Sequence, residues 1–419
     1  MGISDLGRYA LGVWAAAMLA GCGGESGTPL SPSPAGPSTA LRVTTAERTH
    51  VRPAYSVIYS FKGGTGDGRG PTAGLLNVNR TLYGTTANSG ANNAGTVFSI
   101  TPSGADYKEL YSFFKDRRDG ANPLAGLTYV NGTLYGTTEM GGSRYGSGTV
   151  FKMTKSGTET VLHRFGGSGD GQNPDAGLIN VKGTLYGTTY YGDNGYGTVF
   201  SLTPSGKETV LYSFKGGKRD GAKPYTADLL DVSGTLYGTT SRGGARNKGT
   251  VFSITPSGVE KVLRIFRGYR DGRYPLAGLI NVKGTLYGTT PQGGGSGCNG
   301  YGCGTVFSIT TSGVETVLHS FNGTDGENPT AGLIDVNGTL YGTTSNGGSG
   351  SCSFGCGTVF AITTSGEETL LHSFTGKPDG ADPEAGLLNV NGTLYGTTSE
   401  GGAHCGAFSG CGTVFSLSP

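Results

Sequence analysis

A short string, Thr-Leu-Tyr-Gly-Thr-Thr, occurs seven times in this chain at intervals of 50 to 54 residues. A second string, Gly-Thr-Val-Phe, follows each copy of the first. The copies of the first string begin at Thr81, Thr133, Thr184, Thr235, Thr285, Thr339 and Thr393. Because self-similarity at a fixed period of this length is typical of repeat architectures, we interpret the chain as seven copies of one supersecondary unit.

Each unit predicts four short strands with turns between them. In the third repeat these strands are residues 176–181, 184–189, 197–203 and 208–214. The first two strands are joined by pairs such as Asn131-Gly132, which suit a two-residue hairpin that needs positive φ. The first repeat has Asn79-Arg80 instead, and there we expect arginine in a strained position that costs about 1–2 kcal/mol.

Seven four-stranded units predict an all-β fold, a seven-bladed β-propeller of kelch-like blades over residues 54–419. The strand that carries Ala-Gly pairs, such as Ala73-Gly74, is predicted to be innermost, because glycine suits close backbone approach. A lone strand at residues 56–61 precedes the first unit, and the last unit lacks its fourth strand. We therefore expect the N-terminal strand to complete the last blade and close the ring.

The strings Gly-Thr-Leu-Tyr-Gly-Thr-Thr and Gly-Thr-Val-Phe-Ser-Ile-Thr resemble the bacterial GloVer tandem repeat, found in the choice-of-anchor tandem repeat GloVer-containing proteins. The resemblance extends over about residues 55–419. It implies surface anchoring by interchangeable signals and implies no particular activity.

The N-terminal segment has the features of an export signal. Arg8 precedes an apolar stretch, residues 9–20, that is shorter than a typical membrane-spanning helix and has the length of a signal-peptide core. The following Leu19-Ala20-Gly21-Cys22 resembles a bacterial lipobox, in which the cysteine is lipidated. We predict a lipoprotein signal peptide at 1–21, a Gly/Ser/Pro/Thr-rich flexible tether at 22–53, and a lipid-anchored protein of the bacterial outer membrane or cell surface. The alternative is an ordinary secretory signal with a chance cysteine.

The six remaining cysteines form three close pairs, each between the second and third strands of one of the last three repeats. They are Cys298/Cys303, Cys352/Cys356 and Cys405/Cys411. In an exported protein this spacing predicts three local disulfides that stiffen their loops. Structural zinc is the competing interpretation, but the spacings vary and histidine partners are few.

These loops and the seven Asp-Gly loops should share one face, since alternate connections of an up-and-down blade emerge together. Variable loops on a rigid scaffold commonly carry binding residues. We predict a ligand-binding arc over repeats five to seven, made of Tyr301, Phe354 and Phe408 with His404 beside them. The alternative is that each ring only covers its own loop. Asp-Gly pairs are typical of turns, in which glycine supplies positive φ, and their dispersal argues against calcium.

Acids near the inner strands are the candidates for catalysis. They are Asp175, Asp228 and Glu384, and Asp228 replaces the glycine of an Ala-Gly pair. Two such carboxylates could act in glycan hydrolysis. His163, His319 and His372 share one strand position and are interpreted as packing residues, so no metal and no cofactor are predicted. The net charge of +2 argues against nucleic-acid binding, and a monomer is expected.

The leading functional hypothesis is a surface-anchored binding module for a glycan or peptide. The alternatives are a carbohydrate-active hydrolase or lyase that uses channel-facing acids, and a structural cell-envelope protein without a ligand.

Overall fold

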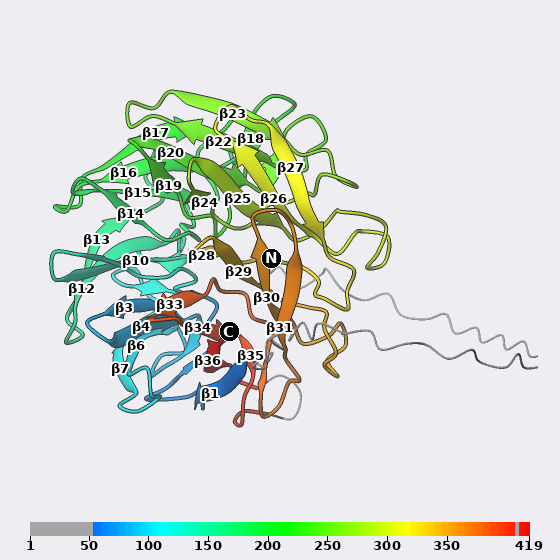
Figure 1. The fold of residues 1–419 in the computed structure, drawn as a ribbon. Coiled ribbons are helices and arrows are strands. Elements are labelled where there is room, and N and C mark those ends of the chain that lie inside the picture. Colours follow the sequence, from blue (N-terminus) through cyan, green and yellow to red (C-terminus); the bar gives the residue numbers. More distant parts are fainter. Residues whose placement is uncertain (1–52, 407–409) are drawn as a thin grey trace, which may run out of the picture. The chain divides into compact units, whose positions relative to one another are not determined.

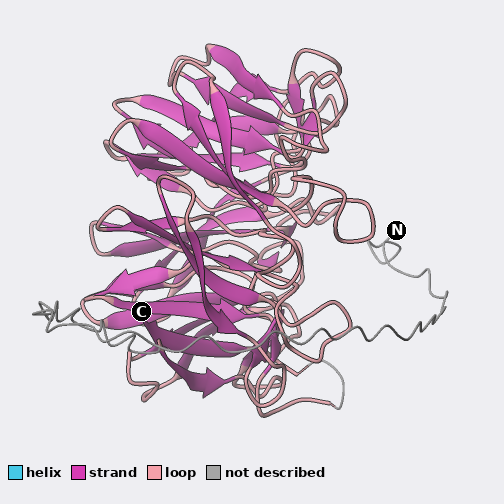
Figure 2. Ribbon diagram, turned by 45° about the vertical axis from the view of Figure 1, so that its right-hand side comes forward, coloured by secondary structure: helices cyan, strands magenta, loops and turns pink. Residues whose placement is uncertain are grey.

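The computed structural model describes residues 53–406 and 410–419, which form strands and turns (Figures 1 and 2). Seven four-stranded antiparallel sheets follow one another along the chain, one per repeat. Within the described residues, no helix is long and apolar enough to cross a membrane. Because every regular element of the described residues is a strand, the all-β prediction is confirmed.

The blades share one strand order, from the innermost strand outward. Blade one has β3 (Leu76–Val78), β4 (Thr81–Thr86), β6 (Thr96–Ile100) and β7 (Lys108–Ser112); blade two has β9 (Thr128–Val130), β10 (Thr133–Thr138), β12 (Thr149–Thr154) and β13 (Glu159–Arg164); blade three has β14 (Ile179–Val181), β15 (Thr184–Thr189), β16 (Thr198–Leu202) and β17 (Glu208–Ser213). Blade four has β19 (Leu230–Val232), β20 (Thr235–Thr240), β22 (Thr250–Ile254) and β23 (Glu260–Ile265); blade five has β24 (Ile280–Val282), β25 (Thr285–Thr290), β26 (Thr305–Thr310) and β27 (Glu315–Ser320). Blade six has β28 (Ile334–Val336), β29 (Thr339–Thr344), β30 (Thr358–Thr363) and β31 (Glu368–Ser373); blade seven has β33 (Leu388–Val390), β34 (Thr393–Thr398), β36 (Thr413–Ser418) and β1 (Ala54–Ser60).

The N-terminal strand completes the last blade, as predicted. β1 pairs antiparallel with β36, from Ala54 opposite Ser418 to Ser60 opposite Thr413. The ring also closes at its centre, where the hydroxyl of Thr397 donates to the carbonyl of Ala73 at 3.1 Å. Both chain ends of the propeller are thus held in one sheet, and no outer strand of the last blade is left unpaired.

The Ala-Gly segment is innermost, but the regular strand begins later than predicted. In blade three it begins at Ile179 rather than at residue 176. The reason is that the Ala-Gly segment bonds to the neighbouring blade: the hydroxyl of Thr137 donates to the carbonyl of Ala176 at 2.9 Å. Backbones approach closely there, since a Cβ on Gly126 would lie 3.2 Å from the Gly74 carbonyl oxygen.

The core repeats between every two blades. A phenylalanine after each outer strand meets, edge to face, a phenylalanine on the third strand of the next blade, with ring centroids 5.1–5.3 Å apart. The pairs are Phe61–Phe98, Phe113–Phe151, Phe165–Phe200, Phe214–Phe252, Phe266–Phe307, Phe321–Phe360 and Phe374–Phe415. All of these rings are buried.

A polar contact also recurs between blades, and we call it the interblade cluster. It joins an outer-strand residue, the aspartate of the next Asp-Gly pair, and a residue at or next to the start of the outer strand of the following blade. Two clusters are Tyr111–Asp119–Glu159 and Tyr212–Asp220–Glu260. Two are His163–Asp170–Glu208 and His319–Asp325–Glu368. The others are Arg264–Asp271–Glu315, Tyr59–Asp67–Tyr107 and His372–Asp379–Tyr55.

The aspartates cap turns, as expected, but the role predicted for the following glycine is wrong. Asp67 accepts hydrogen bonds from the backbone N–H groups of Lys62 and Gly68. Only Gly272 and Gly326, two of the seven glycines, have positive φ. Elsewhere glycine is needed because a Cβ would collide with a buried threonine, as at Gly68 against Thr86.

The strained hairpin arginine is present. Arg80 has φ 64° and is exposed, whereas the six other repeats have glycine at this position. We expect Arg80→Gly to raise the free energy of unfolding by about 0.5–1 kcal/mol, because relief of the left-handed strain outweighs the greater flexibility of glycine in the unfolded chain. Denaturant unfolding of both proteins would test this, and a less stable variant would contradict it.

Two interblade glutamates predict a pH dependence of stability. Burial, with a smaller effect of Asp119, raises the pKa of Glu159 to about 7, and burial beside Asp220 does the same for Glu260. The folded protein therefore binds these protons more tightly than the unfolded chain, whose glutamates have a pKa near 4.5. This contribution to stability is present below about pH 4.5 and is lost as the pH rises through 7.

We therefore expect the double variant Glu159→Gln/Glu260→Gln to lose less stability than the wild type between pH 5 and pH 8. Because both groups are partly exposed, solvent screening limits the effect to roughly 1 kcal/mol for each. Denaturant unfolding at the two pH values measures it. Parallel losses in both proteins would show that these carboxyl groups do not titrate as inferred.

Candidate binding face

The two kinds of long loop lie together, as predicted from the sequence. In four repeats a short strand of the Asp-Gly loop pairs with one in the loop between the second and third strands. The pairs are β2 (Gly68–Arg69) with β5 (Asn88–Ser89), β8 (Gly120–Ala121) with β11 (Met140–Gly141), β18 (Gly221–Ala222) with β21 (Arg242–Gly243), and β32 (Gly380–Ala381) with β35 (Glu400–Gly401). Single bridges such as Gln172 to Tyr191 join the loops in the other three. Figure 2 shows long loops gathered at one side of the sheets, the face we call the loop face.

The three predicted disulfides form within this face: Cys298–Cys303, Cys352–Cys356 and Cys405–Cys411. The second cysteine of each pair is buried. Cys411 lies under the Asp-Gly loop that leads into blade one, where a Cβ on Gly63 would be 3.0 Å from its sulfur. Each disulfide therefore closes its own loop, and in the last repeat its sulfur atoms pack against the neighbouring Asp-Gly loop.

The side chains predicted to bind a ligand are exposed but separate. Tyr301 is 60% exposed and Phe354 is 63% exposed. His404 is also exposed, and Phe408 lies outside the described residues. No ring contact joins Tyr301 to Phe354 in the described structure. Tyr301 instead contacts Arg273, which donates to the Tyr301 carbonyl at 2.7 Å and lies 5.2 Å from its ring centroid.

A group of aromatic and basic side chains, which the sequence analysis missed, lies on the loops of repeats three to five. The ammonium of Lys223 is 3.3 Å from the ring centroid of Tyr191 and 4.5 Å from that of Tyr190. Tyr190 packs edge to face on Tyr225 at 5.5 Å. We call this group, with its continuation around Tyr274, the aromatic–cation arc.

Tyr274 continues the arc in repeat five. The guanidinium of Arg242 is 4.3 Å from its ring centroid, and Lys248 donates to its hydroxyl at 2.5 Å. Although burial opposes ionisation, Lys248 and Arg242 together lower the pKa of Tyr274. Burial lowers the pKa of Lys223 to about 8, against the influence of Asp175. The arc therefore places three basic side chains, Lys223, Arg242 and Lys248, against tyrosine rings.

Two residues of the arc lie in a backbone position that they do not favour. The residue before the loop proline has a left-handed φ of 54–66° in all seven repeats. It is Gly70, Asn122, Asn173, Asn328 or Asp382 in five repeats, but Lys223 in the fourth and Tyr274 in the fifth. Bulky side chains at such φ values cost on the order of 1 kcal/mol. A comparison of the seven repeats at this position could have identified both residues from the sequence.

The three candidate acids line one central cavity of about 490 Å³ between the inner strands. Asp228 faces this channel and accepts a 2.6 Å hydrogen bond from the N–H of Gly177. Solvent in the channel reaches its side chain, yet enclosure by the ring raises its pKa against the effect of that bond. Burial raises the pKa of Glu384, with added repulsion from Asp382 and Glu400.

Asp175 connects the channel to the arc. It is buried, and its Oδ1 has no hydrogen-bond partner among the described residues. Burial, followed by the charge of Glu139, raises its pKa, whereas Lys223 acts in the opposite direction. The mouth of the channel at repeats three and four thus combines a carboxyl group, an ammonium group and tyrosine rings.

The fourth repeat also departs from the shared backbone pattern. Tyr225 and Thr226 stand between the loop proline and Ala227, where the other repeats have one residue. In the other six blades the threonine equivalent to Thr188 donates to the alanine carbonyl of the next blade. The Thr188 hydroxyl is buried without a partner among the described residues. The extra residue therefore removes a regular interblade bond at the place where it adds Tyr225.

Comparison with solved structures finds matches at low sequence identity. An oligogalacturonate lyase in complex with manganese is 8% identical, with 88% of this chain and 96% of that chain covered and a TM-score of 0.50. The computationally designed protein Ika8 is 14% identical, with 86% and 99% covered and a TM-score of 0.48. A putative 6-phosphogluconolactonase from Bacteroides uniformis is 12% identical, with 74% and 86% covered and a TM-score of 0.45. Likeness at this level concerns the fold alone.

No curated protein matches the chain. The model of the Gloeobacter/Verrucomicrobia repeat matches three times, over residues 38–193, 114–300 and 299–419. These matches confirm the resemblance that the repeated strings indicated. The chain therefore belongs to the Gloeobacter/Verrucomicrobia repeat family.

Proposed function

We propose that this protein is a surface-anchored binding module whose ligand is a glycan with acidic groups, held by the aromatic–cation arc of repeats three to five. The observation that carries the proposal is the left-handed backbone of Lys223 and Tyr274. Five repeats avoid this strain with Gly, Asn or Asp, and the two that accept it place their side chains against neighbouring rings and cations. Lysine also adopts a left-handed φ in the hairpin turns at Lys182 and Lys283, so it is the strain together with the ring and cation contacts that marks Lys223 and Tyr274.

The charge of the region favours an anionic ligand. Residues 215–283 contain thirteen lysines and arginines and five acids, a net charge of +8, whereas the whole chain carries +2. A groove of about 600 Å³ beside blade four adds Arg219, Arg246 and Arg267 to its lining. Lysine and arginine bind carboxylates through charge-assisted hydrogen bonds, and tyrosine offers a flat apolar face with a polar edge. This combination suits sugar rings that carry carboxylate groups.

Anchoring by lipid is part of the proposal. Leu19-Ala20-Gly21-Cys22 supports it, although these residues lie outside those the structure describes. We expect Cys22→Ser to abolish incorporation of a labelled fatty acid and to release the protein from the membrane fraction. Labelling that persists in the variant would contradict the anchor and would leave the binding proposal untouched.

The binding proposal predicts that Lys223→Asn/Tyr274→Asn weakens binding at least tenfold while stability is unchanged or higher. Asparagine restores the residue that three repeats use at this φ, so the variant loses the arc without losing the fold. Lys283→Asn is the matched control, because it removes the same charge from a tight hairpin turn outside the loop face. Binding of the full chain would be measured on an array of acidic and neutral glycans.

The array separates the competing functions. Binding of acidic glycans that the double variant loses and Lys283→Asn retains supports the proposal. Equal binding of polyaspartate would indicate charge recognition without sugar recognition, and peptide binding would indicate a protein ligand. Silence on every array, with no glycan turnover, would favour a structural role.

The channel acids support a second candidate, a glycan hydrolase or lyase. The observation in its favour is that Asp175, Asp228 and Glu384 line one cavity and that enclosure raises the pKa of each. Burial raises the pKa of Glu384 to about 8, so this carboxyl group keeps its proton near neutral pH and is suited to act as a general acid. Turnover of an array ligand that Glu384→Gln abolishes would establish this reaction in place of simple binding.

A further inference from the structure

Two interblade clusters bring together three groups that commonly ligate metals. In one, Nε2 of His163 lies 3.1 Å from Oδ2 of Asp170, and Glu208 reaches the pair from the next blade. In the other, Nε2 of His319 lies 3.0 Å from Oδ2 of Asp325, and Glu368 is the third member. In each cluster the nitrogen and the two carboxylate oxygens lie within 4.8 Å of one another.

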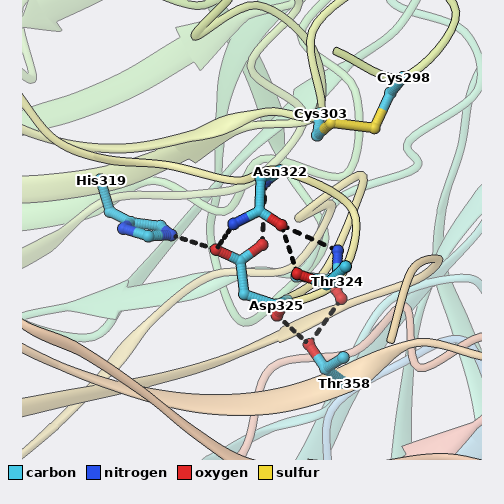
Figure 3. Close-up of polar contacts among 8 residues, drawn as sticks. Cys298, Cys303, His319, Asn322, Thr324, Asp325 and Thr358 are labelled. Atoms are coloured by element: carbon cyan, nitrogen blue, oxygen red, sulfur yellow. Dashed lines mark hydrogen bonds and ion pairs between the residues drawn. A yellow bond between two sulfur atoms is a disulfide. The ribbon is translucent and has the colours of Figure 1, made fainter. Parts of the chain in front are cut away.

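Figure 3 shows two members of the second cluster, and in it the His319 ring points at the Asp325 carboxylate. Asn322 holds that carboxylate from the other side, with its backbone N–H on Oδ1 and its amide on Oδ2, both at 2.9 Å. The aspartate is therefore fixed in place by its own loop. The histidine and aspartate side chains are 19% and 14% exposed, so an ion can enter from solvent.

The Arg264 cluster shows that a positive charge fits between the two carboxyl groups of an interblade cluster. There the same two carboxyl positions, Asp271 and Glu315, lie 2.9 and 2.8 Å from one guanidinium nitrogen. A permanent positive charge thus sits between an aspartate of one blade and a glutamate of the next. The His163 and His319 clusters keep both carboxyl groups but replace arginine with histidine, which has no permanent charge.

The glutamates at these two clusters, like Glu315 of the Arg264 cluster, have one buried oxygen without a hydrogen-bond partner among the described residues. Oε1 of Glu208 and Oε1 of Glu368 are buried and make no hydrogen bond within the described part of the chain. A buried carboxylate oxygen without a donor is costly, and a cation satisfies it directly. What separates the third site from these two is the permanent positive charge of Arg264, which contacts both Asp271 and Glu315.

We propose that the His163–Asp170–Glu208 and His319–Asp325–Glu368 clusters each bind a zinc ion that links neighbouring blades. Zn²⁺ accepts imidazole nitrogen and carboxylate oxygen at about 2.0–2.2 Å, and three protein ligands leave one position for water. The ion takes the place of the hydrogen on Nε2, and the imidazole then carries its proton on Nδ1. A small movement of the long glutamate side chain completes the set. The ion joins blade two to blade three, and blade five to blade six.

The His372 cluster is the internal control. His372 has the same strand position and the same bond to an aspartate, at 3.2 Å from Asp379. Its third member is Tyr55, whose ring stacks on the imidazole with centroids 3.7 Å apart. Only two ligands remain there, so His372 should not bind zinc.

The experiment is calorimetric titration of the full chain, stripped with EDTA, with zinc chloride alone. We expect two ions per chain for the wild type and for His372→Gln. His319→Arg should bind one, and His163→Arg/His319→Arg none, because arginine recreates the Arg264 cluster and occupies the site with its own charge. Zinc should raise the Tm of the wild type and leave that of the double arginine variant unchanged.

Two results would overturn the proposal. One is the absence of zinc binding by the wild type; the other is equal stoichiometry in the wild type and the double arginine variant, which would place the ions elsewhere, for instance at His404. Should the arginine variants fail to fold, Co²⁺ provides a readout on the wild type alone. Visible bands of nitrogen- and oxygen-ligated Co²⁺ that excess Zn²⁺ displaces support the sites, and a spectrum of hexahydrated Co²⁺ rejects them.

Discussion

The edge-to-face contact between phenylalanines of neighbouring blades determines most of this structure. It is made seven times and returns on itself, because Phe61 of the N-terminal strand packs on Phe98 of blade one. Full burial of each ring contributes about 1.5–3 kcal/mol relative to exposure. The glycine of Thr-Leu-Tyr-Gly-Thr-Thr makes the contact possible: a Cβ on Gly84 would lie 2.5 Å from Cζ of Phe98. The repeated strings are thus requirements of packing, and they carry no information about a ligand.

Outside the phenylalanines, the interblade clusters form a polar layer that tolerates exchange of side chains. Tyrosine, histidine and arginine can each donate to the aspartate at this position of the repeat, as Tyr111, His163 and Arg264 do in their own clusters. The backbone can therefore stay constant while the charge of each cluster changes. This separation of geometry from charge allows one cluster to contain its own cation while others offer the same carboxyl groups to an ion.

The fold could be predicted from the sequence because its determinants recur in register: the hairpin pairs, the Val-Phe strands and the incomplete last unit each point to one closed ring. The candidate site could be predicted only in part. Asp228 was expected in the channel because it replaces a glycine of known role. The interblade clusters were missed because their members come from three segments, as His163, Asp170 and Glu208 do, and no periodicity within one repeat brings them together. The arc could not be predicted from aromatic rings between cysteines, because its members Lys223 and Tyr274 are marked instead by a backbone position that the other repeats fill with Gly, Asn or Asp.

Seven copies of one unit make such departures informative. At the junction of repeats three and four, Thr188 loses its regular bond, Thr226 adopts a φ of 37°, and Asp228 brings a carboxylate among glycines. The unpartnered Thr188 hydroxyl and the Thr226 backbone each destabilise this junction, yet the ring can accommodate them because six other junctions and a closed last blade keep the regular geometry. A scaffold with this redundancy can concentrate strain, charge and aromatic surface at one place. The accumulation of all three at repeats three to five is the reason to look for the ligand there rather than at the disulfide-bonded loops.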